Sequence, residues 1–266
     1  DPLCRKDFLD IYAYAKKKGF LITIFTSAAL VNETIAAYFK ESPPFVVEVT
    51  VPAATKKTHE FITQVPGSFQ RQMRGIQLLR RGKIPLRIKV LITRDNQDEI
   101  AGLRKKVAAW GSKLTVDCDI CARLNGDRSP CSLRLPEHDT WWRKGSAPLK
   151  GLFQCLPSSK KGTVFPCAVG SGDGFWIDPR GKMFLCQLIR DPAYSLLRNS
   201  IHEAFKKNRA FFADAGYKTD SLCRACLIRD ECFSCPGKAL LETGDMEAAI
   251  PYYCRIASLR KKGGEP

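Results

Sequence analysis

The first 118 residues alternate two hydrophobic patterns. In some segments apolar residues recur at helical spacing, as Phe8, Ile11, Tyr12 and Ala15 do, and in others they form short, nearly continuous runs. The pattern predicts helices at 5–18, 29–39, 68–81 and 96–110, and strands at 20–25, 45–51, 86–92 and 113–117. Strands that alternate with helices indicate an α/β fold with a parallel sheet, in which ligands bind at the carboxyl ends of the strands.

The pattern changes after this region. Residues 129–151 are rich in proline, tryptophan and charge, which is typical of a connector. The run Phe175–Cys186 predicts a β-hairpin, because Asp178-Pro179-Arg180-Gly181 has the residues of a tight turn.

Composition excludes several classes of protein. The chain has 266 residues, of which 44% are hydrophobic, and a net charge of +16. No apolar run approaches the ~18 residues that a membrane span requires. The basic groups are short and scattered, without an aromatic RNA-binding signature, so nucleic acid is an unfavoured partner, whereas an acidic peptide suits the charge.

Twelve cysteines are the main chemical feature, and seven of them lie between Cys167 and Cys254. A disulfide framework is disfavoured because the density is low and no signal peptide is present. Structural zinc is an alternative, although zinc ribbons separate their two Cys-x2-Cys pairs by more than the five residues found here. Nested Cys-x2-Cys units and the pair Cys235-Pro236 favour iron–sulfur clusters, which implies a reducing, cytoplasmic location.

The full spacing resembles a known domain. It reads Cys-x13-Gly-x4-Cys, then Cys-x2-Cys-x5-Cys-x2-Cys, then a single cysteine. This resembles the SPASM domain of radical S-adenosylmethionine enzymes, with x2 in place of the usual x3. The resemblance implies two auxiliary [4Fe–4S] clusters. Their ligands would be Cys167, Cys186 and Cys235 for the inner cluster, and Cys223, Cys226, Cys232 and Cys254 for the outer one.

The inner set then contains three cysteines, and a four-iron cluster binds four ligands. Either Cys155 is the fourth ligand, or one iron is open to substrate, which is the hypothesis preferred from sequence. Cys118 and Cys121 are interpreted as small buried residues, with a cluster role as a secondary option.

The α/β region resembles part of the radical S-adenosylmethionine barrel. Asp1-Pro2 is similar to the end of a Gly-Gly-Glu/Asp-Pro motif, Thr50 lies where the family places a ribose contact, and Asn96-x2-Glu99 is similar to a cofactor-site signature. The resemblance therefore implies that Asp1, Thr50, Asn96 and Glu99 bind the cofactor. Where the family has Thr-Asn-Gly, this chain has Thr26-Ser27-Ala28, and the family's Cys-x3-Cys-x2-Cys loop does not occur in it.

These features predict a partial barrel at 1–128 that lacks its first strands, a connector at 129–165 and a SPASM domain at 166–266. The expected function is modification of a peptide or protein substrate, for which an acidic leader is one option, with an electron donor as a further partner. S-adenosylmethionine and a third [4Fe–4S] cluster would be present only in an intact, N-terminally longer protein, so the enzymatic status of this chain alone is left open. The alternative is a non-catalytic iron–sulfur or zinc module derived from such an enzyme.

Overall fold

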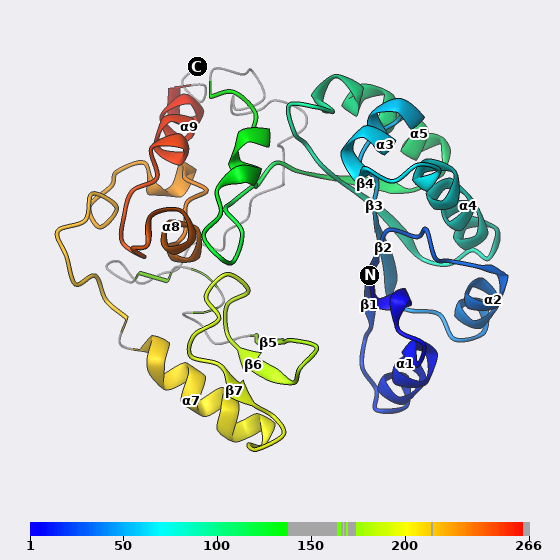
Figure 1. Ribbon diagram of the computed structural model, residues 1–266, viewed down its shortest axis with the longest axis horizontal. Coiled ribbons are helices and arrows are strands. Elements are labelled where there is room, and N and C mark those ends of the chain that lie inside the picture. The colour runs from blue at the N-terminus through cyan, green and yellow to red at the C-terminus, as the bar shows by residue number, and fades with distance from the viewer. Residues whose placement is uncertain (138–163, 166, 168, 170–173, 214, 263–266) are drawn as a thin grey trace. The chain divides into compact units, whose positions relative to one another are not determined.

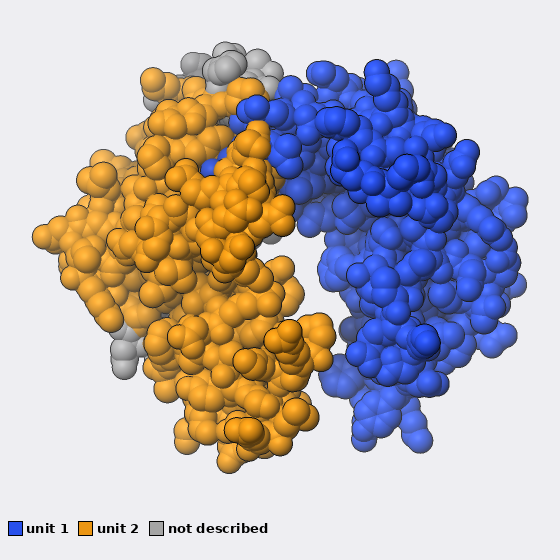
Figure 2. Space-filling model, in the orientation of Figure 1, with its two compact units in different colours: residues 1–118, 133–135 blue, residues 119–132, 136–266 orange. Residues whose placement is uncertain are grey.

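The computed structural model describes residues 1–137, 164, 165, 167, 169, 174–213 and 215–262. The chain divides into two compact units (Figure 2). Unit 1 contains residues 1–118 and 133–135, and unit 2 contains residues 119–132 and 136–266. Most of the predicted connector, residues 138–163, lies outside the described residues, as does Cys155.

Unit 1 is built on a parallel sheet (Figure 1). Its four strands are β1 (Thr23–Thr26), β2 (Val46–Thr50), β3 (Leu86–Leu91) and β4 (Lys113–Asp117), which neighbour one another in that order and are parallel throughout. The intervening helices are α1 (Phe8–Lys17), α2 (Glu33–Glu41), α3 (Lys56–Thr63), α4 (Ser68–Arg81) and α5 (Ile100–Ala109). The predicted α/β class and parallel sheet are confirmed.

The core of unit 1 lies between the sheet and its helices. Alternate strand residues such as Val49 and Ile88 are fully buried, together with Phe39, Leu79 and Leu103 from the helices. The other sheet face is polar: Glu48 pairs with Arg87 at 3.3 Å. Because side chains alternate between faces along a strand, the same pattern produces both a packed and a charged face.

Several elements of unit 1 differ from the prediction. The helices α1 and α2 begin at Phe8 and Glu33, three and four residues later than predicted. β1 starts only at Thr23, because Phe20 and Leu21 are 65% and 83% exposed and precede the sheet. The predicted helix at 96–110 begins as a 3-10 turn, Gln97–Glu99, before α5. The sequence pattern missed α3 entirely, although Thr55 caps it by accepting a hydrogen bond from the Thr58 backbone N–H.

The described residues of unit 2 form a small antiparallel sheet and three α-helices. The strands are β5 (Trp176–Ile177), β6 (Lys182–Phe184) and β7 (Tyr194–Ser195), so a β5–β6 hairpin lies within the predicted 175–186 run. The helices are α7 (Ile201–Ala213), α8 (Pro236–Thr243) and α9 (Pro251–Lys262). Short 3-10 turns lie at Ser129–Leu133, before the small sheet, and at Arg229–Glu231, between α7 and α8. Among the described residues, no helix has the length and apolarity needed to cross a membrane.

Candidate functional site

Asp1 lies at the carboxyl end of β1. Its carboxylate accepts hydrogen bonds from the Thr26 hydroxyl at 2.8 Å and from both the backbone N–H and the hydroxyl of Ser27 at 2.8 Å. The segment that replaces the family's Thr-Asn-Gly therefore holds the acidic residue of the predicted cofactor motif. Thr50 is the last residue of the neighbouring strand β2, and it is exposed.

Asn96 lies beyond the carboxyl end of β3 and is only 2% exposed. Its amide nitrogen donates to the carbonyl oxygens of Pro52 at 2.8 Å and Leu91 at 2.9 Å, and its Oδ1 accepts from the Thr93 backbone N–H at 2.8 Å. Both amide hydrogens thus bind backbone carbonyls. Asn96 joins the loop after β2 to the end of β3.

Glu99 binds the same loop after β2. Its carboxylate accepts from the backbone N–H groups of Ala54 at 2.7 Å and Thr55 at 2.9 Å, and from the hydroxyls of Thr55 and Thr58. Burial disfavours the charged carboxylate, but these hydrogen bonds outweigh burial and hold the pKa of Glu99 below its usual range. Asn96 and Glu99 together fix the backbone beside Thr50.

The polar face of the sheet carries charges of both signs. Besides the Glu48–Arg87 pair, the Lys89 ammonium lies 3.2 Å from the Asp117 carboxylate, and each of these two side chains is about one-third exposed. Lys89 stands opposite Thr50 in the register of β2 and β3. A cation therefore lies beside the strand end where a ribose contact was predicted.

In unit 2, the four cysteines predicted for the outer cluster gather around one cavity. A cavity of about 110 Å³ has walls mostly of apolar side chains. Its lining includes Cys223, Cys226, Cys232 and Cys254, together with Cys235. Burial raises the pKa of Cys232, and the charges of the other three thiols raise it further. Two hydrogen bonds involve the Cys232 sulfur, from the Ser234 backbone N–H at 3.4 Å and to the Tyr253 carbonyl at 3.9 Å.

The three cysteines predicted for the inner cluster form a second group. Burial raises the pKa of Cys186, and the nearby thiol of Cys167 raises it further. Burial likewise raises the pKa of Cys235 to about 11, with Cys186 among the charges that act on it. Cys235 thus neighbours both groups, and as the N-terminal cap of α8 it occupies a fixed position.

Within the described part of the chain, no three Cys, His, Asp or Glu side chains converge as ligands of a single metal ion. Thiolates on one tetrahedral zinc, at a bond length of 2.3 Å, would lie about 3.8 Å apart. Thiolates on a four-iron cluster bind different irons and stand wider apart. The donor set is all sulfur and lines a largely apolar cavity, a chemistry that suits iron–sulfur clusters and also zinc.

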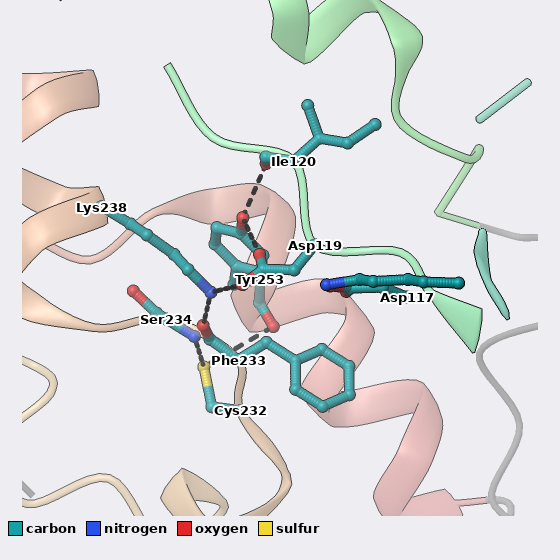
Figure 3. A network of polar contacts seen from close by, with 9 residues as sticks. Asp117, Asp119, Ile120, Cys232, Phe233, Ser234, Lys238 and Tyr253 are labelled. Atoms are coloured by element: carbon teal, nitrogen blue, oxygen red, sulfur yellow. Dashed lines mark hydrogen bonds and ion pairs between the residues drawn. The ribbon is translucent and has the colours of Figure 1, made fainter. Parts of the chain in front are cut away.

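A buried polar network adjoins these cysteines, and the sequence analysis missed it (Figure 3). The Lys238 ammonium lies 2.5 Å from the Asp119 carboxylate, and the Tyr253 hydroxyl donates to Asp119. Lys238 also donates to the Phe233 carbonyl and lies 4.9 Å from the centre of the Tyr253 ring. A signal was available: a lysine in the first turn of a helix opposes the helix dipole, so it indicates an acidic partner.

Comparisons with known proteins identify relatives by sequence. No model of a known protein family matches the chain. The AdoMet-dependent heme synthase of Methanosarcina barkeri is 21% identical over 279 residues, covering 95% of this chain and 79% of that protein. The enzyme of the same name from Nitratidesulfovibrio vulgaris is 31% identical over 96 residues, covering 36% of this chain and 26% of that protein.

Solved structures extend the comparison to the fold. Native anSMEcpe with bound AdoMet superimposes with a TM-score of 0.66 at 15% identity, over 97% of this chain and 77% of that one. Streptococcus suis SuiB bound to S-adenosylmethionine superimposes with a TM-score of 0.67 at 12% identity, over 95% of this chain and 64% of that one. The chain has the fold of radical S-adenosylmethionine enzymes. The resemblance to radical S-adenosylmethionine enzymes is thereby confirmed. The anSMEcpe structure has also been solved with a bound peptide, and that complex gives a TM-score of 0.63 at 14% identity.

Proposed function

We propose that the chain is the cofactor- and cluster-binding part of a radical S-adenosylmethionine enzyme of the SPASM type. The observation that carries the proposal is the division of seven cysteines in unit 2 into a group of four around one cavity and a neighbouring group of three. The outer cluster would be held by Cys223, Cys226, Cys232 and Cys254. The inner cluster would be held by Cys167, Cys186 and Cys235.

In unit 1 the proposed cofactor site lies at the strand ends. Asp1, fixed by Thr26 and Ser27, would accept hydrogen bonds from the amino group of the methionyl moiety, and Thr50 would contact the ribose. Asn96 and Glu99 would act by positioning the loop beside Thr50, because their polar atoms bind that backbone. S-adenosylmethionine, when bound and reduced by a cluster of the intact protein, would supply a radical able to abstract hydrogen from a substrate.

The protein's own contribution would be binding, orientation and electrostatics. The largely apolar cavity lowers the local dielectric around the thiolates, and backbone N–H groups donate to their sulfurs, as Ser234 does to Cys232. Hydrogen bonds to cluster sulfurs and burial are the properties by which a protein sets the reduction potential of an iron–sulfur centre. The auxiliary clusters, when bound, transfer single electrons or bind substrate, and the thiol chemistry suits a reducing cytoplasm.

Two substrate classes follow from the comparisons. A solved relative binds a peptide, and a net charge of +16 would attract an acidic leader. The relatives of similar sequence are named heme synthases, and a haem precursor also carries carboxylates. Titrations of the chain with an acidic peptide and with an iron porphyrin bearing propionates, at equal salt, would separate the two. An electron donor is required in either case.

The first experiment is the metal content of anaerobically reconstituted protein, with electron paramagnetic resonance. Two four-iron clusters predict about eight irons and eight sulfides per chain. Cys232→Ala should lower the iron content by at least one iron, since one iron of the outer cluster loses its thiolate, and Cys4→Ala, an exposed cysteine of unit 1, should remove none. Stoichiometric zinc without iron would overturn the proposal in favour of a structural zinc module.

A further inference from the structure

Gln72 of α4 joins the carboxyl ends of two strands of unit 1. Its side-chain amide nitrogen donates hydrogen bonds to the carbonyl oxygens of Ser27 at 2.8 Å and Thr50 at 2.9 Å. Ser27 follows β1 directly, and Thr50 is the last residue of β2. The last pair in the register of the two strands is Thr26 with Val49, one residue earlier on each strand. The Gln72 amide therefore bridges β1 and β2 at the point where their ladder ends.

The Gln72 amide is buried and its orientation is fixed. Gln72 is 2% exposed and lies on the face of α4 that also carries Gly75, three residues further along the helix. Its Oε1 has no hydrogen-bond partner among the described residues, so the two carbonyls are the groups that hold this amide in place. Because water does not compete for a buried hydrogen bond, the bridge restricts both strand ends.

The two bridged strand ends carry the two halves of the proposed cofactor site. Ser27 binds the Asp1 carboxylate through its backbone N–H and its hydroxyl, both at 2.8 Å. Thr50 is the residue expected at the ribose. A ligand with an amino acid at one end and a nucleoside at the other must contact both ends at once. The separation of Ser27 and Thr50 therefore decides how well such a ligand fits.

The two strand ends are held unequally by the rest of the sheet. β2 lies between β1 and β3, where Thr50 stands opposite Lys89 and the Val51 N–H donates to the Lys89 carbonyl at 2.7 Å. Among the described strands β1 pairs only with β2, and Ser27 lies beyond its last pair. Loss of the Gln72 amide should therefore displace Ser27, and with it Asp1, more than Thr50.

We propose that Gln72 is a positioning residue for the binding of S-adenosylmethionine. Its amide sets the spacing between the strand end that holds Asp1 and the strand end that carries Thr50. The inference rests on the proposed function, since it concerns the cofactor site of that function. Gln72 acts through the backbone carbonyls of Ser27 and Thr50, so it affects those ligands that span both ends of the site.

The test compares two ligands that need no cluster in order to bind. S-adenosylhomocysteine has both an amino-acid end and a nucleoside end, whereas methylthioadenosine keeps the nucleoside and lacks the amino acid. Dissociation constants of the full chain for both are measured by ligand-observed nuclear magnetic resonance. Gln72→Met, which keeps the length of the side chain without its donors, should weaken S-adenosylhomocysteine binding by about tenfold or more, because the two ends no longer act together. Binding of methylthioadenosine should stay nearly unchanged, since the β2–β3 ladder still holds Thr50.

Gln77→Met is the matched control. It makes the same change at an exposed position of α4, and it should leave both dissociation constants as in wild type. Gln72→Asn is a second variant, which keeps the amide on a shorter side chain that cannot reach both carbonyls. It should also weaken S-adenosylhomocysteine binding selectively. Circular dichroism shows whether each variant is folded.

Two results would overturn the inference. One is wild-type affinity for S-adenosylhomocysteine in the Gln72 variants. The other is an equal loss of affinity for both ligands, which would make Gln72 a residue of the fold without a role in spacing the site. Failure of the wild-type chain to bind S-adenosylhomocysteine would instead overturn the cofactor site of the proposed function, so the two failures are distinguishable.

Discussion

Gly75 of α4 packs directly on the backbone of Ala28. A β-carbon at position 75 would lie 1.9 Å from the Ala28 carbonyl oxygen, which is closer than any non-bonded contact allows. Ala28 follows the end of β1, adjacent to the Thr26 and Ser27 that bind Asp1. The packing of α4 and the position of the proposed cofactor motif are therefore coupled through this contact.

We expect Gly75→Ala to destabilise the protein by about 1–3 kcal/mol, the usual cost of overpacking a core. The measurement is urea unfolding followed by circular dichroism. The control is Gly102→Ala in α5, where a β-carbon would meet its nearest neighbour at 3.8 Å. That control should be neutral or stabilising by up to about 1 kcal/mol, because alanine favours helix. Equal effects of the two substitutions would contradict the close contact with Ala28.

Lys238→Met should be strongly destabilising, because it leaves Asp119 without its buried cation. Removing one partner of a buried pair typically costs about 3–5 kcal/mol. The double variant Lys238→Met with Asp119→Asn should recover part of that loss, since it removes the uncompensated charge. Denaturant unfolding of the metal-free protein measures the loss of stability in the single variant and its recovery in the double variant. Lys206→Met, at an exposed position, is the control. A double variant as unstable as the sum of the two single variants would argue against a direct interaction.

Asn96→Ala should destabilise unit 1 by about 1–3 kcal/mol, because it leaves the Pro52 and Leu91 carbonyls without their buried donor. Asn96→Asp should be at least as harmful, since a carboxylate would face two carbonyl oxygens. Asn32→Asp provides the matched control: Asn32 caps α2, where aspartate is an equally good acceptor, so the change should be nearly neutral. Hydrogen exchange of the 52–55 loop would show whether the Asn96 variants loosen this loop. Unchanged protection of the loop would contradict the anchoring role of Asn96.

The sequence predicted most of the sheet, because buried parallel strands are short apolar runs between amphipathic helices. α4 and β4 begin and end at the predicted residues. The prediction failed where local pattern and tertiary contact diverge. Phe20 and Leu21 are apolar yet precede the sheet, and the polar helix α3 depends on its cap and on Glu99 rather than on an apolar stripe.

The candidate site could be predicted only as far as spacing allows. Spacing grouped the cysteines, because thiols two or three residues apart on a loop must lie close together. It could not pair Asp119 with Lys238, which lie 119 positions apart in the sequence yet form an ion pair at 2.5 Å. Nor could it indicate that Asn96 binds backbone carbonyls, since the spacing Asn-x2-Glu carries no information about the partners of the asparagine amide.

His59 should make unit 1 sensitive to mild acid. It lies on α3, is 1% exposed, and packs edge-on against Phe69 with ring centres 5.4 Å apart. Burial lowers the pKa of His59 below its usual value, and the nearby Glu60 only partly offsets this. The unfolded chain, with a histidine pKa of about 6.5, therefore binds a proton more readily than the folded chain.

The direction in which stability changes with pH follows from proton linkage. Where the unfolded state binds more protons, the free energy of unfolding falls as pH falls. We therefore expect His59 to leave the free energy of unfolding unchanged above about pH 6.5. Below that pH the free energy of unfolding should fall, until the pH reaches the lowered pKa of the folded state.

Urea unfolding at intervals between pH 7.5 and about 5.5 avoids the range in which carboxylates titrate. His59→Phe, which keeps an aromatic ring against Phe69, should flatten this dependence, whereas replacement of the exposed His202 on α7 should leave it as in wild type. The same slope in wild type and His59→Phe would show that the buried imidazole is not the group responsible.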